Sequence, residues 1–405
     1  MFSKQEKWII FTLAFLQFSH IVDFMIIMPL GPQLSRIFSI SPEQFSFLVA
    51  AYTFMSGLSG FLATFYADKY DRKKILLYMF LGFMISTLLC GMAPSYTFLV
   101  ICRSIAGFFG GVMGAQCMSI ISDIIPFEKR GTAMGILTTS FSLASILGVP
   151  LSLFFSNIFG WHAPFYLLSL TCLVVLYFFI KKIPNMNAHI KTHHPKTDVL
   201  KPLFDILNNR VQVRSLLFMF VLMFGHFSVI PFISQSLVAN AGLTEQQLPL
   251  IYLTGGICSI LTAPLIGRLS DKFGKYKMYI YAIFFSFIPT VLITHQGIAP
   301  LFVLLFISGL FFISAGARMI PANTLVSAAA NSTHRGSFMS ILSCIQSLSM
   351  ALGSWFAGQV ILKNPTNGHL ERYEIVGYVS IVVGLASLYL IHKIKHLDHI
   401  QKATL

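Results

Sequence analysis

The residue with the most distinctive chemistry is Asp23, the one carboxylate that lies deep within an apolar stretch of the sequence. An ionised carboxylate at the middle of a membrane costs about 3 kcal/mol or more unless it is paired or hydrated. A buried carboxylate can avoid that cost by binding a proton. Asp23 therefore suits proton coupling, and a structural polar contact is the alternative.

Two histidines and two arginines also interrupt apolar stretches. His20 precedes Asp23 by three residues, which places both on one helix face, and His226 holds the matching place in the second half. Histidine titrates near neutral pH and can relay protons, with a hydrogen-bonded scaffold role as the alternative. Arg103 and Arg318 are permanent cations. No acid of the second half lies as deep as Arg318, so Arg318 either binds an anionic or carbonyl part of a solute or contacts helix carbonyls.

These side chains must be positioned by helices that cross a membrane. The 405 residues are 56% hydrophobic and only 10% charged, whereas a soluble domain carries about 25% charged residues. A spanning helix needs roughly 20 mostly apolar residues. Apolar windows, divided at turn residues, predict twelve spans, over residues 8–31, 44–66, 75–93, 96–121, 132–157, 163–180, 213–238, 247–268, 277–296, 299–323, 336–361 and 373–394.

The distribution of basic residues predicts the orientation of the spans. The net charge of +14 would suggest nucleic acid in a soluble protein, but here most Lys and Arg residues occupy the loops that follow even-numbered spans. The Lys and Arg residues of the other loops are only Arg36, Lys363 and Arg372. Positive charge concentrates in cytoplasmic loops, so we expect both termini in the cytoplasm and no nucleic-acid partner. We therefore expect three parts: an N-terminal six-helix bundle over residues 1–180, a cytoplasmic linker over 181–212, and a C-terminal six-helix bundle with a short cytoplasmic tail over 213–405.

An internal repeat supports this division. Ser41–Gln44 and Thr244–Gln247 each read as a capping box that opens a span. Asp68-Lys69 and Asp271-Lys272 close the same two spans at the same offset of 203 residues. The prolines within the predicted spans, which remove backbone donors, predict interruptions or kinks at Pro29, Pro150, Pro231, Pro264 and Pro321.

Several motifs resemble those of the major facilitator superfamily. The run Gly267-Arg-Leu-Ser-Asp271-Lys272-Phe-Gly274-Lys275 resembles its loop motif, and the first half has a degraded copy in which Thr64 and Asp71 replace glycines. Arg103-Ser-Ile-Ala-Gly107 resembles its Arg-x-x-x-Gly motif in span four. Gly148-Val-Pro150 in span five resembles its antiporter-type motif, in the form found in sugar-efflux-like and drug-efflux-like members.

The resemblance carries expectations for individual residues. It places spans one and four around a central cavity, so we expect proton coupling at Asp23, His20 and Arg103, and a substrate cavity at Asp23, Arg103, Arg318 and His226. It also implies a charge network that locks one gating state, for which topological anchoring is the alternative. We expect that network at Asp68, Lys69, Arg72, Asp123 and Arg130, with Asp271 and Lys275 as the second-half copy. Gly148 and Pro150 are expected to form the antiporter-type kink.

The fold class that we expect is an all-α membrane protein, with twelve transmembrane helices in two pseudo-symmetric six-helix bundles. The expected function is secondary active transport by alternating access, in the form of proton-coupled efflux of a small organic solute such as a drug, sugar or metabolite. A proton symporter or uniporter that imports a nutrient is one alternative, and a non-transporting membrane receptor or membrane enzyme is another. The expected partners are a small-molecule substrate, protons and the lipid bilayer. We expect a monomer in a bacterial cytoplasmic membrane, with no catalytic residues, metal or cofactor.

Overall fold

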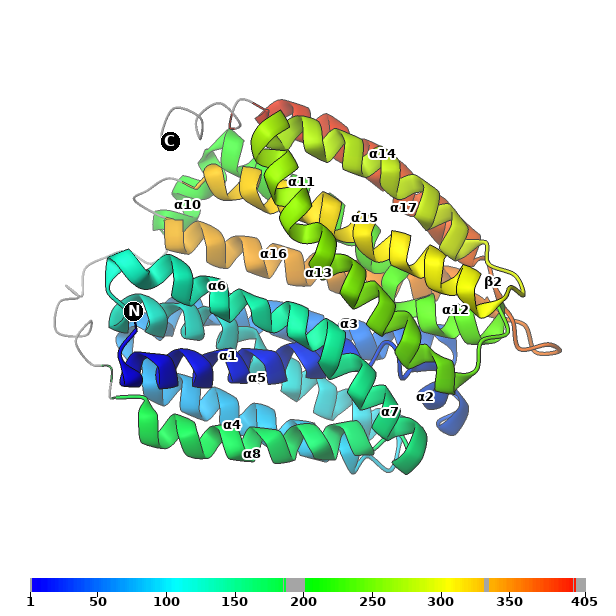
Figure 1. Ribbon diagram of the computed structural model, residues 1–405, viewed down its shortest axis with the longest axis horizontal. Coiled ribbons are helices and arrows are strands. Elements are labelled where there is room, and N and C mark those ends of the chain that lie inside the picture. Colours follow the sequence, from blue (N-terminus) through cyan, green and yellow to red (C-terminus); the bar gives the residue numbers. More distant parts are fainter. Residues whose placement is uncertain (1, 185, 187–200, 331–334, 396, 398–405) are drawn as a thin grey trace. The chain divides into compact units, whose positions relative to one another are not determined.

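The computed structural model describes residues 2–184, 186, 201–330, 335–395 and 397. Within these residues, twelve helical segments are long and apolar enough to cross a membrane, which confirms the predicted number (Figure 1). The first six are α1 (Lys4–Ile26), α3 (Pro42–Tyr66), α4 (Arg72–Gly91), α5 (Tyr96–Ile124), α6 with α7 (Phe127–Leu143 and Val149–Phe159), and α8 (Ala163–Lys182). The other six are α11 with α12 (Arg210–Val229 and Ile233–Ala239), α13 (Leu248–Phe273), α14 (Lys275–Thr294), α15 (Leu301–Ala328), α16 (Arg335–Val360) and α17 (Tyr373–Ile394).

Both predicted capping boxes are present. The hydroxyl of Ser41 accepts from the backbone N–H of Gln44 at 3.2 Å, and the Gln44 side chain accepts from the N–H of Ser41 at 2.9 Å. Thr244 and Gln247 make the same reciprocal pair ahead of α13. These boxes satisfy N–H groups that a helix start leaves without partners.

Two of the five prolines break their spans, and they do so at matching places. After α1, residues 27–30 form turns that contain Pro29, and a short helix α2 (Gly31–Ile37) follows, so the predicted span to residue 31 is too long. After α11, a 3₁₀ turn (Ile230–Phe232) contains Pro231 and leads into α12. A proline cannot donate to the preceding turn and its ring crowds the carbonyl four residues earlier, which accounts for both breaks.

The other three prolines are accommodated within helical spans. Pro150 follows a π-helical segment, η2 (Ala144–Gly148), between α6 and α7, and such wider turns are commonly found at functional sites. Pro264 and Pro321 lie inside continuous α-helices, so neither interrupts its span, and a kink at either residue stays a prediction. Neighbouring helices can satisfy the carbonyl that such a proline releases.

The described residues form two compact units. Unit 1 comprises those of 1–27 and 51–197, and unit 2 those of 28–50 and 198–405. In unit 1, α1 packs against α5, α6 and α8, and α4 packs against α5 and α8. Their shared core includes Leu13, Phe80, Met113, Leu137 and Phe179. The predicted linker at 181–212 falls partly on residues 187–200, which lie outside the described residues.

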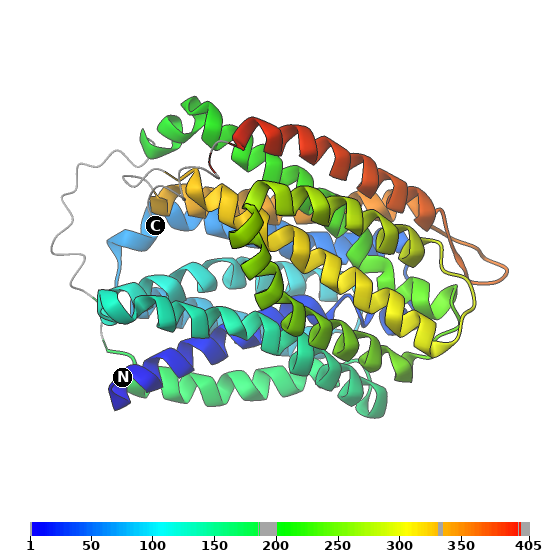
Figure 2. The same cartoon turned by 45° about the horizontal axis from the view of Figure 1, so that its top comes forward.

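In unit 2, α11 packs against α16 and α17, and α14 runs beside α15 and α17 (Figures 1 and 2). A two-stranded hairpin of β1 (Leu362–Lys363) and β2 (Leu370–Glu371) joins α16 to α17. Helix α2 packs against α12. Unit 2 thus includes a segment, residues 28–50, that belongs to the first two spans of the chain.

Candidate functional site

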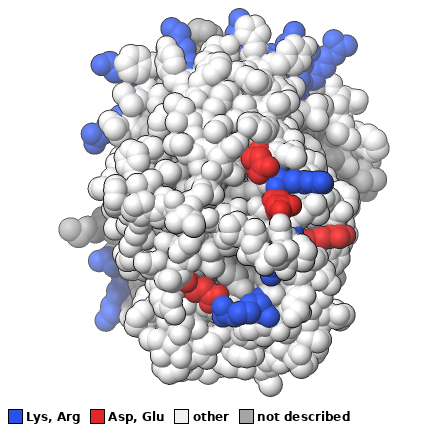
Figure 3. Space-filling view, turned by 90° about the vertical axis from the view of Figure 1, so that its right-hand side faces the viewer, with Lys and Arg blue, Asp and Glu red and all other residues white. Residues whose placement is uncertain are grey.

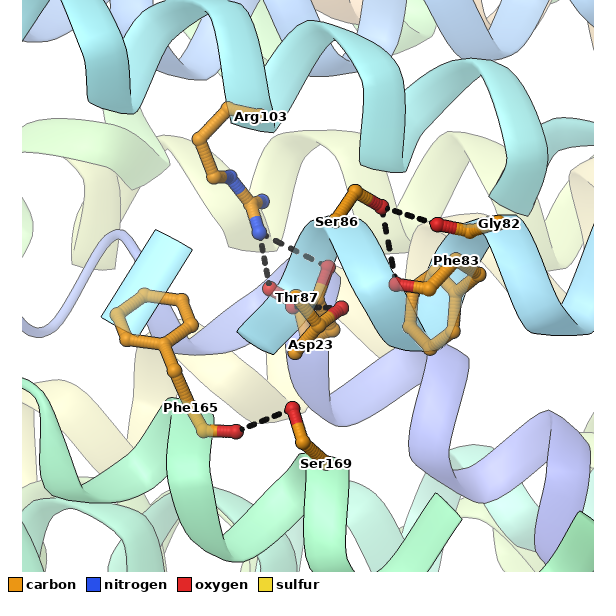
Figure 4. A network of polar contacts seen from close by, with 8 residues as sticks. All are labelled: Asp23, Gly82, Phe83, Ser86, Thr87, Arg103, Phe165 and Ser169. Atoms are coloured by element: carbon orange, nitrogen blue, oxygen red, sulfur yellow. Dashed lines mark hydrogen bonds and ion pairs between the residues drawn. The ribbon is translucent and has the colours of Figure 1, made fainter. Parts of the chain in front are cut away.

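Asp23 and Arg103 form a fully buried ion pair in unit 1 (Figure 4). An Nη1 hydrogen of Arg103 on α5 is donated to Oδ2 of Asp23 on α1 at 2.8 Å, and the same nitrogen lies 3.2 Å from the backbone carbonyl of Asp23. The hydroxyl of Thr87 on α4 donates to the second carboxylate oxygen at 3.3 Å. Three helices therefore meet at one carboxylate whose side chain is 0% exposed. The sequence analysis expected both residues at one central cavity, and the structure places their charged groups in contact.

Polar atoms without protein partners surround this pair. Tyr52 on α3 lies under the guanidinium, with its ring centroid 4.2 Å from Cζ of Arg103. Nε and Nη2 of Arg103 and both ring nitrogens of His20 are buried without a hydrogen-bond partner among the described residues. Leaving such groups unpaired costs about 1–3 kcal/mol each. The arrangement therefore has spare hydrogen-bonding capacity of the kind that a proton or a polar solute uses.

Glycines hold α1 close to the helices around it. A Cβ added at Gly110 on α5 would lie 2.7 Å from the His20 ring, and one added at Gly107 would collide with the backbone carbonyl of Tyr52. The small residues in span four thus allow a close approach of α1 and α3, as small residues do in membrane helices.

The predicted antiporter-type motif lies against the helix that carries Asp23. A Cβ at Gly148 would collide with the side chain of Val22, the residue before Asp23. Gly148 ends the π-helical segment, and Pro150, two residues later, is buried. The wider turn and the missing side chain together bring this part of span five onto α1.

His226 and Arg318 pair within unit 2. Nη2 of Arg318 on α15 lies 3.1 Å from Nδ1 of His226 on α11. Arg318 is 5% exposed, and the His226 ring stacks on Phe311 with centroids 6.1 Å apart. His20 and His226, which match in sequence, therefore have different surroundings: the second is hydrogen-bonded to an arginine and the first is not.

Several of the expected gating residues make polar contacts near helix ends. Arg72 at the start of α4 pairs with Asp123 near the end of α5 at 2.9 Å, and both lie in unit 1. Nε of Arg130 donates to the carbonyl of Ile125 at 2.9 Å, which satisfies a group at the end of α5. Lys69 is exposed, and the side chain of Asp68 lies outside the described part of the chain. In unit 2, Lys275 contacts Asp271 at 3.3 Å, and the Asp271 side chain is 76% exposed.

The two copies of the loop motif differ in their turn. Gly274, between α13 and α14, has φ +92°, a conformation that favours glycine. At the matching place, Asp71 has φ −57° and caps α4: one carboxylate oxygen accepts from the N–H of Lys73 at 2.8 Å. The other oxygen accepts from the N–H of Met186 at 3.2 Å. The departure from the glycine pattern thus replaces a tight turn by a helix cap.

A set of contacts that the sequence did not predict joins α2 and the start of α3 to other parts of unit 2. Arg36 on α2 makes two hydrogen bonds to Glu245, at 2.5 and 3.1 Å, and the Gln235 amide donates to the hydroxyl of Ser35 at 3.2 Å. Beneath them Phe45 packs edge-on against Phe232. The Arg36–Glu245 pair borders a cavity of about 1000 Å³ that the hairpin also lines. Figure 3 shows neighbouring acidic and basic side chains on this otherwise largely uncharged end.

Sequence reasoning missed the partners that lie far away in the chain. Tyr52 and Thr87 lie at positions with no motif, and Glu245 lies inside a capping box that does not indicate Arg36 as its partner; only packing brings them to Arg103, Asp23 and Arg36. A polar residue within an apolar span is a weak signal that could have indicated Thr87, because it needs a partner there.

The chain matches known membrane transporters. The profile of the Major Facilitator Superfamily matches residues 13–354, with a second match over 215–403. The uncharacterized MFS-type transporter YceJ of Bacillus subtilis (strain 168) is 27% identical over 313 residues, 75% of this chain and 78% of the relative. A probable sugar efflux transporter of Helicobacter pylori (strain P12) is 22% identical over 260 residues, 64% and 65% of the two chains.

Solved structures share the fold. A D-xylose–proton symporter superimposes with a TM-score of 0.75 at 19% identity, covering 94% of this chain and 96% of its own. A bacterial homologue of the human lysosomal transporter Spinster, in an inward-facing and unoccupied conformation, gives a TM-score of 0.73 at 16% identity, covering 99% and 97%. With twelve spans and a family match over most of its length, the chain belongs to the Major Facilitator Superfamily, as a multi-pass membrane transporter of small molecules.

Proposed function

We propose that this protein is a proton-coupled exporter of a small organic solute, a drug, sugar or metabolite, that works by alternating access. It would act as a monomer in a bacterial cytoplasmic membrane, with both termini in the cytoplasm. The observation that carries the proposal is the buried Asp23–Arg103 pair. The similarity to a probable sugar efflux transporter favours the outward direction.

The coupling argument starts from the difference between the two partners. A guanidinium keeps its proton in proteins, so Asp23 is the member of the pair that can change charge. A proton on Oδ2 would remove the charge that holds Arg103 at 2.8 Å. While the pair is intact, the fixed guanidinium offers its unpartnered Nε and Nη2 groups to a solute, and the released guanidinium would no longer hold those donors in place. Proton binding and solute binding would thus alternate at one place.

The groups around the pair support a proton path. His20 lies three residues before Asp23 on α1 and has two unpartnered ring nitrogens, so its neutral ring can accept a proton from one side and donate one to the other. Gly148 lies against Val22, the residue before Asp23 on α1. A shift in span five would therefore be transmitted to the carboxylate directly.

Charges at the ends of the helices would bias the gating states. We propose that Arg72–Asp123, together with Asp68, Lys69 and Arg130, and in the second half Asp271–Lys275, stabilise one state. The Arg36–Glu245 pair would stabilise closure at the other membrane face. Residues 28–50 lie in unit 2 although α1 and the rest of α3 lie in unit 1. A movement of the units would therefore have to strain the chain near residues 27–28 and 50–51, or detach this segment.

The test uses inside-out vesicles with a respiration-driven proton gradient and a pH-sensitive dye. Solute panels of lipophilic cations, sugars, amino acids and organic acids are added to wild type, Asp23→Asn and a control, Glu128→Gln, which removes an exposed carboxylate from the first turn of α6 in unit 1. Dye recovery with one class, lost in Asp23→Asn and kept in Glu128→Gln, supports proton antiport at Asp23. Full coupled transport in Asp23→Asn would refute it.

The alternatives give different signals in the same vesicles. A symporter moves protons and solute in the same direction. Dye recovery would then require solute loaded inside the vesicles, and solute added outside would not produce it. A uniporter moves solute without any dye response. A receptor binds solute tightly without flux.

A further inference from the structure

Arg318 is a permanent cation buried near the middle of α15. It lies ten residues before the helix ends at Ala328 and is 5% exposed. A buried charge without a counter-ion is costly, and charged residues inside membrane spans usually pair with one another or face a solute path. The nature of its partners therefore indicates what the site is built to bind.

The partner that the structure gives Arg318 carries no negative charge. A guanidinium only donates, so Nδ1 of His226 must accept, which requires the neutral imidazole with its proton on Nε2. The pair therefore retains a net charge of +1. Phe311 stacks on the His226 ring and fixes its plane.

Other groups nearby do not neutralise this charge. The nearby Tyr279 hydroxyl is paired with Ser387 at 2.6 Å. Among the described residues, no carboxylate forms an ion pair with Arg318, and the described acids of unit 2 lie near helix ends or outside the spans: Glu43, Asp205, Glu245, Asp271, Glu371 and Glu374. In unit 1, by contrast, Arg103 has Asp23.

We propose that Arg318 and His226 bind an anionic group of the transported solute, a carboxylate, phosphate or sulfonate. The guanidinium supplies the charge, and the Nε2–H of His226 is a second donor whose direction Phe311 fixes. The inference rests on the proposed transport function and narrows its solute class. It assigns the anion to unit 2 and leaves proton coupling to Asp23 in unit 1.

The test measures the unfolding temperature of the purified full-length protein in detergent with matched pairs of probes at equal concentration. The pairs are gluconate and sorbitol, glucose 6-phosphate and glucose, and benzenesulfonate and benzenesulfonamide. A bound ligand stabilises the folded state. We expect at least one anion to raise the unfolding temperature by about 2 °C or more above its neutral partner.

Variants test whether this difference in unfolding temperature between an anion and its neutral partner arises at Arg318 and His226. Arg318→Gln should abolish it and Arg318→Lys should keep part of it, while Arg210→Gln, which removes an exposed arginine from α11, should leave it intact. His226→Asp puts a carboxylate oxygen where Nδ1 lies, so it should fold with an internal ion pair and lose the response. This variant keeps the test decisive if Arg318→Gln does not fold.

Two results would overturn the inference: no anion that stabilises wild type more than its neutral partner, or a response that persists in both Arg318→Gln and His226→Asp. Asp23→Asn separates this inference from the proposed coupling. It should lose proton movement but keep the anion response, so the two proposals can fail independently.

Discussion

Removing the charge of Asp23 should leave Arg103 as an uncompensated cation in the core of unit 1. Both side chains are 0% exposed, and the ion-pair distance is 2.8 Å. Breaking a buried pair by removing one partner costs about 3–5 kcal/mol. Asp23→Asn keeps the shape and one acceptor, so we expect about 3 kcal/mol of destabilisation. Arg103→Met should cost less, because the remaining carboxyl can neutralise itself by binding a proton.

The double variant should recover most of the loss, because a pair of neutral side chains leaves no buried charge. A double-mutant cycle isolates this coupling, which we expect to be about 2–3 kcal/mol in favour of the pair. The matched control is the cycle of Arg72→Met and Asp123→Asn. That pair has a similar distance, 2.9 Å, but its side chains are 16% and 31% exposed, so its coupling should be below about 1 kcal/mol.

The assay is equilibrium unfolding in mixed micelles, followed by far-ultraviolet circular dichroism, for the four members of each cycle. The reasoning depends on burial as the source of the difference between the two pairs. A coupling at Asp23–Arg103 no larger than that at Arg72–Asp123 would refute it, whatever the effects of the single variants.

Two further predictions concern packing and closure. Gly148→Ala should be about 1–3 kcal/mol less stable than the control Gly135→Ala in the same unfolding assay. The Cβ added at position 148 would collide with Val22, whereas nothing lies within 4 Å of a Cβ at position 135. Equal stabilities of the two variants would contradict the close contact of Gly148 with α1. Arg36→Glu should increase the rate at which an impermeant maleimide labels a cysteine introduced at the buried Gln235 in whole cells. The expected increase is about fivefold, since an exposed ion pair is worth about 1 kcal/mol. Adding Glu245→Arg, which restores a pair with exchanged charges, should reverse the increase. A rate that ignores both changes would show that this pair does not hold the segment closed.

The sequence determined the number of spans and the places where several begin. Apolar length alone defines a membrane helix, because every backbone group must be satisfied within the span. The capping boxes at Ser41 and Thr244 use only contacts three residues apart, so they too can be read locally. The effect of each proline cannot be read from the local sequence: Pro29 and Pro231 break their helices, while Pro264 and Pro321 do not. What a proline does depends on the groups around its freed carbonyl, which lie on other helices.

The sequence likewise indicated Asp23, Arg103, His226 and Arg318, because ionisable residues in apolar runs are conspicuous. Which of them meet was decided only by tertiary structure. The Asp23–Arg103 contact joins residues 80 apart and the His226–Arg318 contact residues 92 apart. Such contacts depend on helix rotation and on how closely glycines such as Gly107 and Gly148 let backbones approach. The charge at each site, neutral at Asp23–Arg103 and +1 at His226–Arg318, follows from those packings, because an arginine is neutralised only by the groups that packing places beside it.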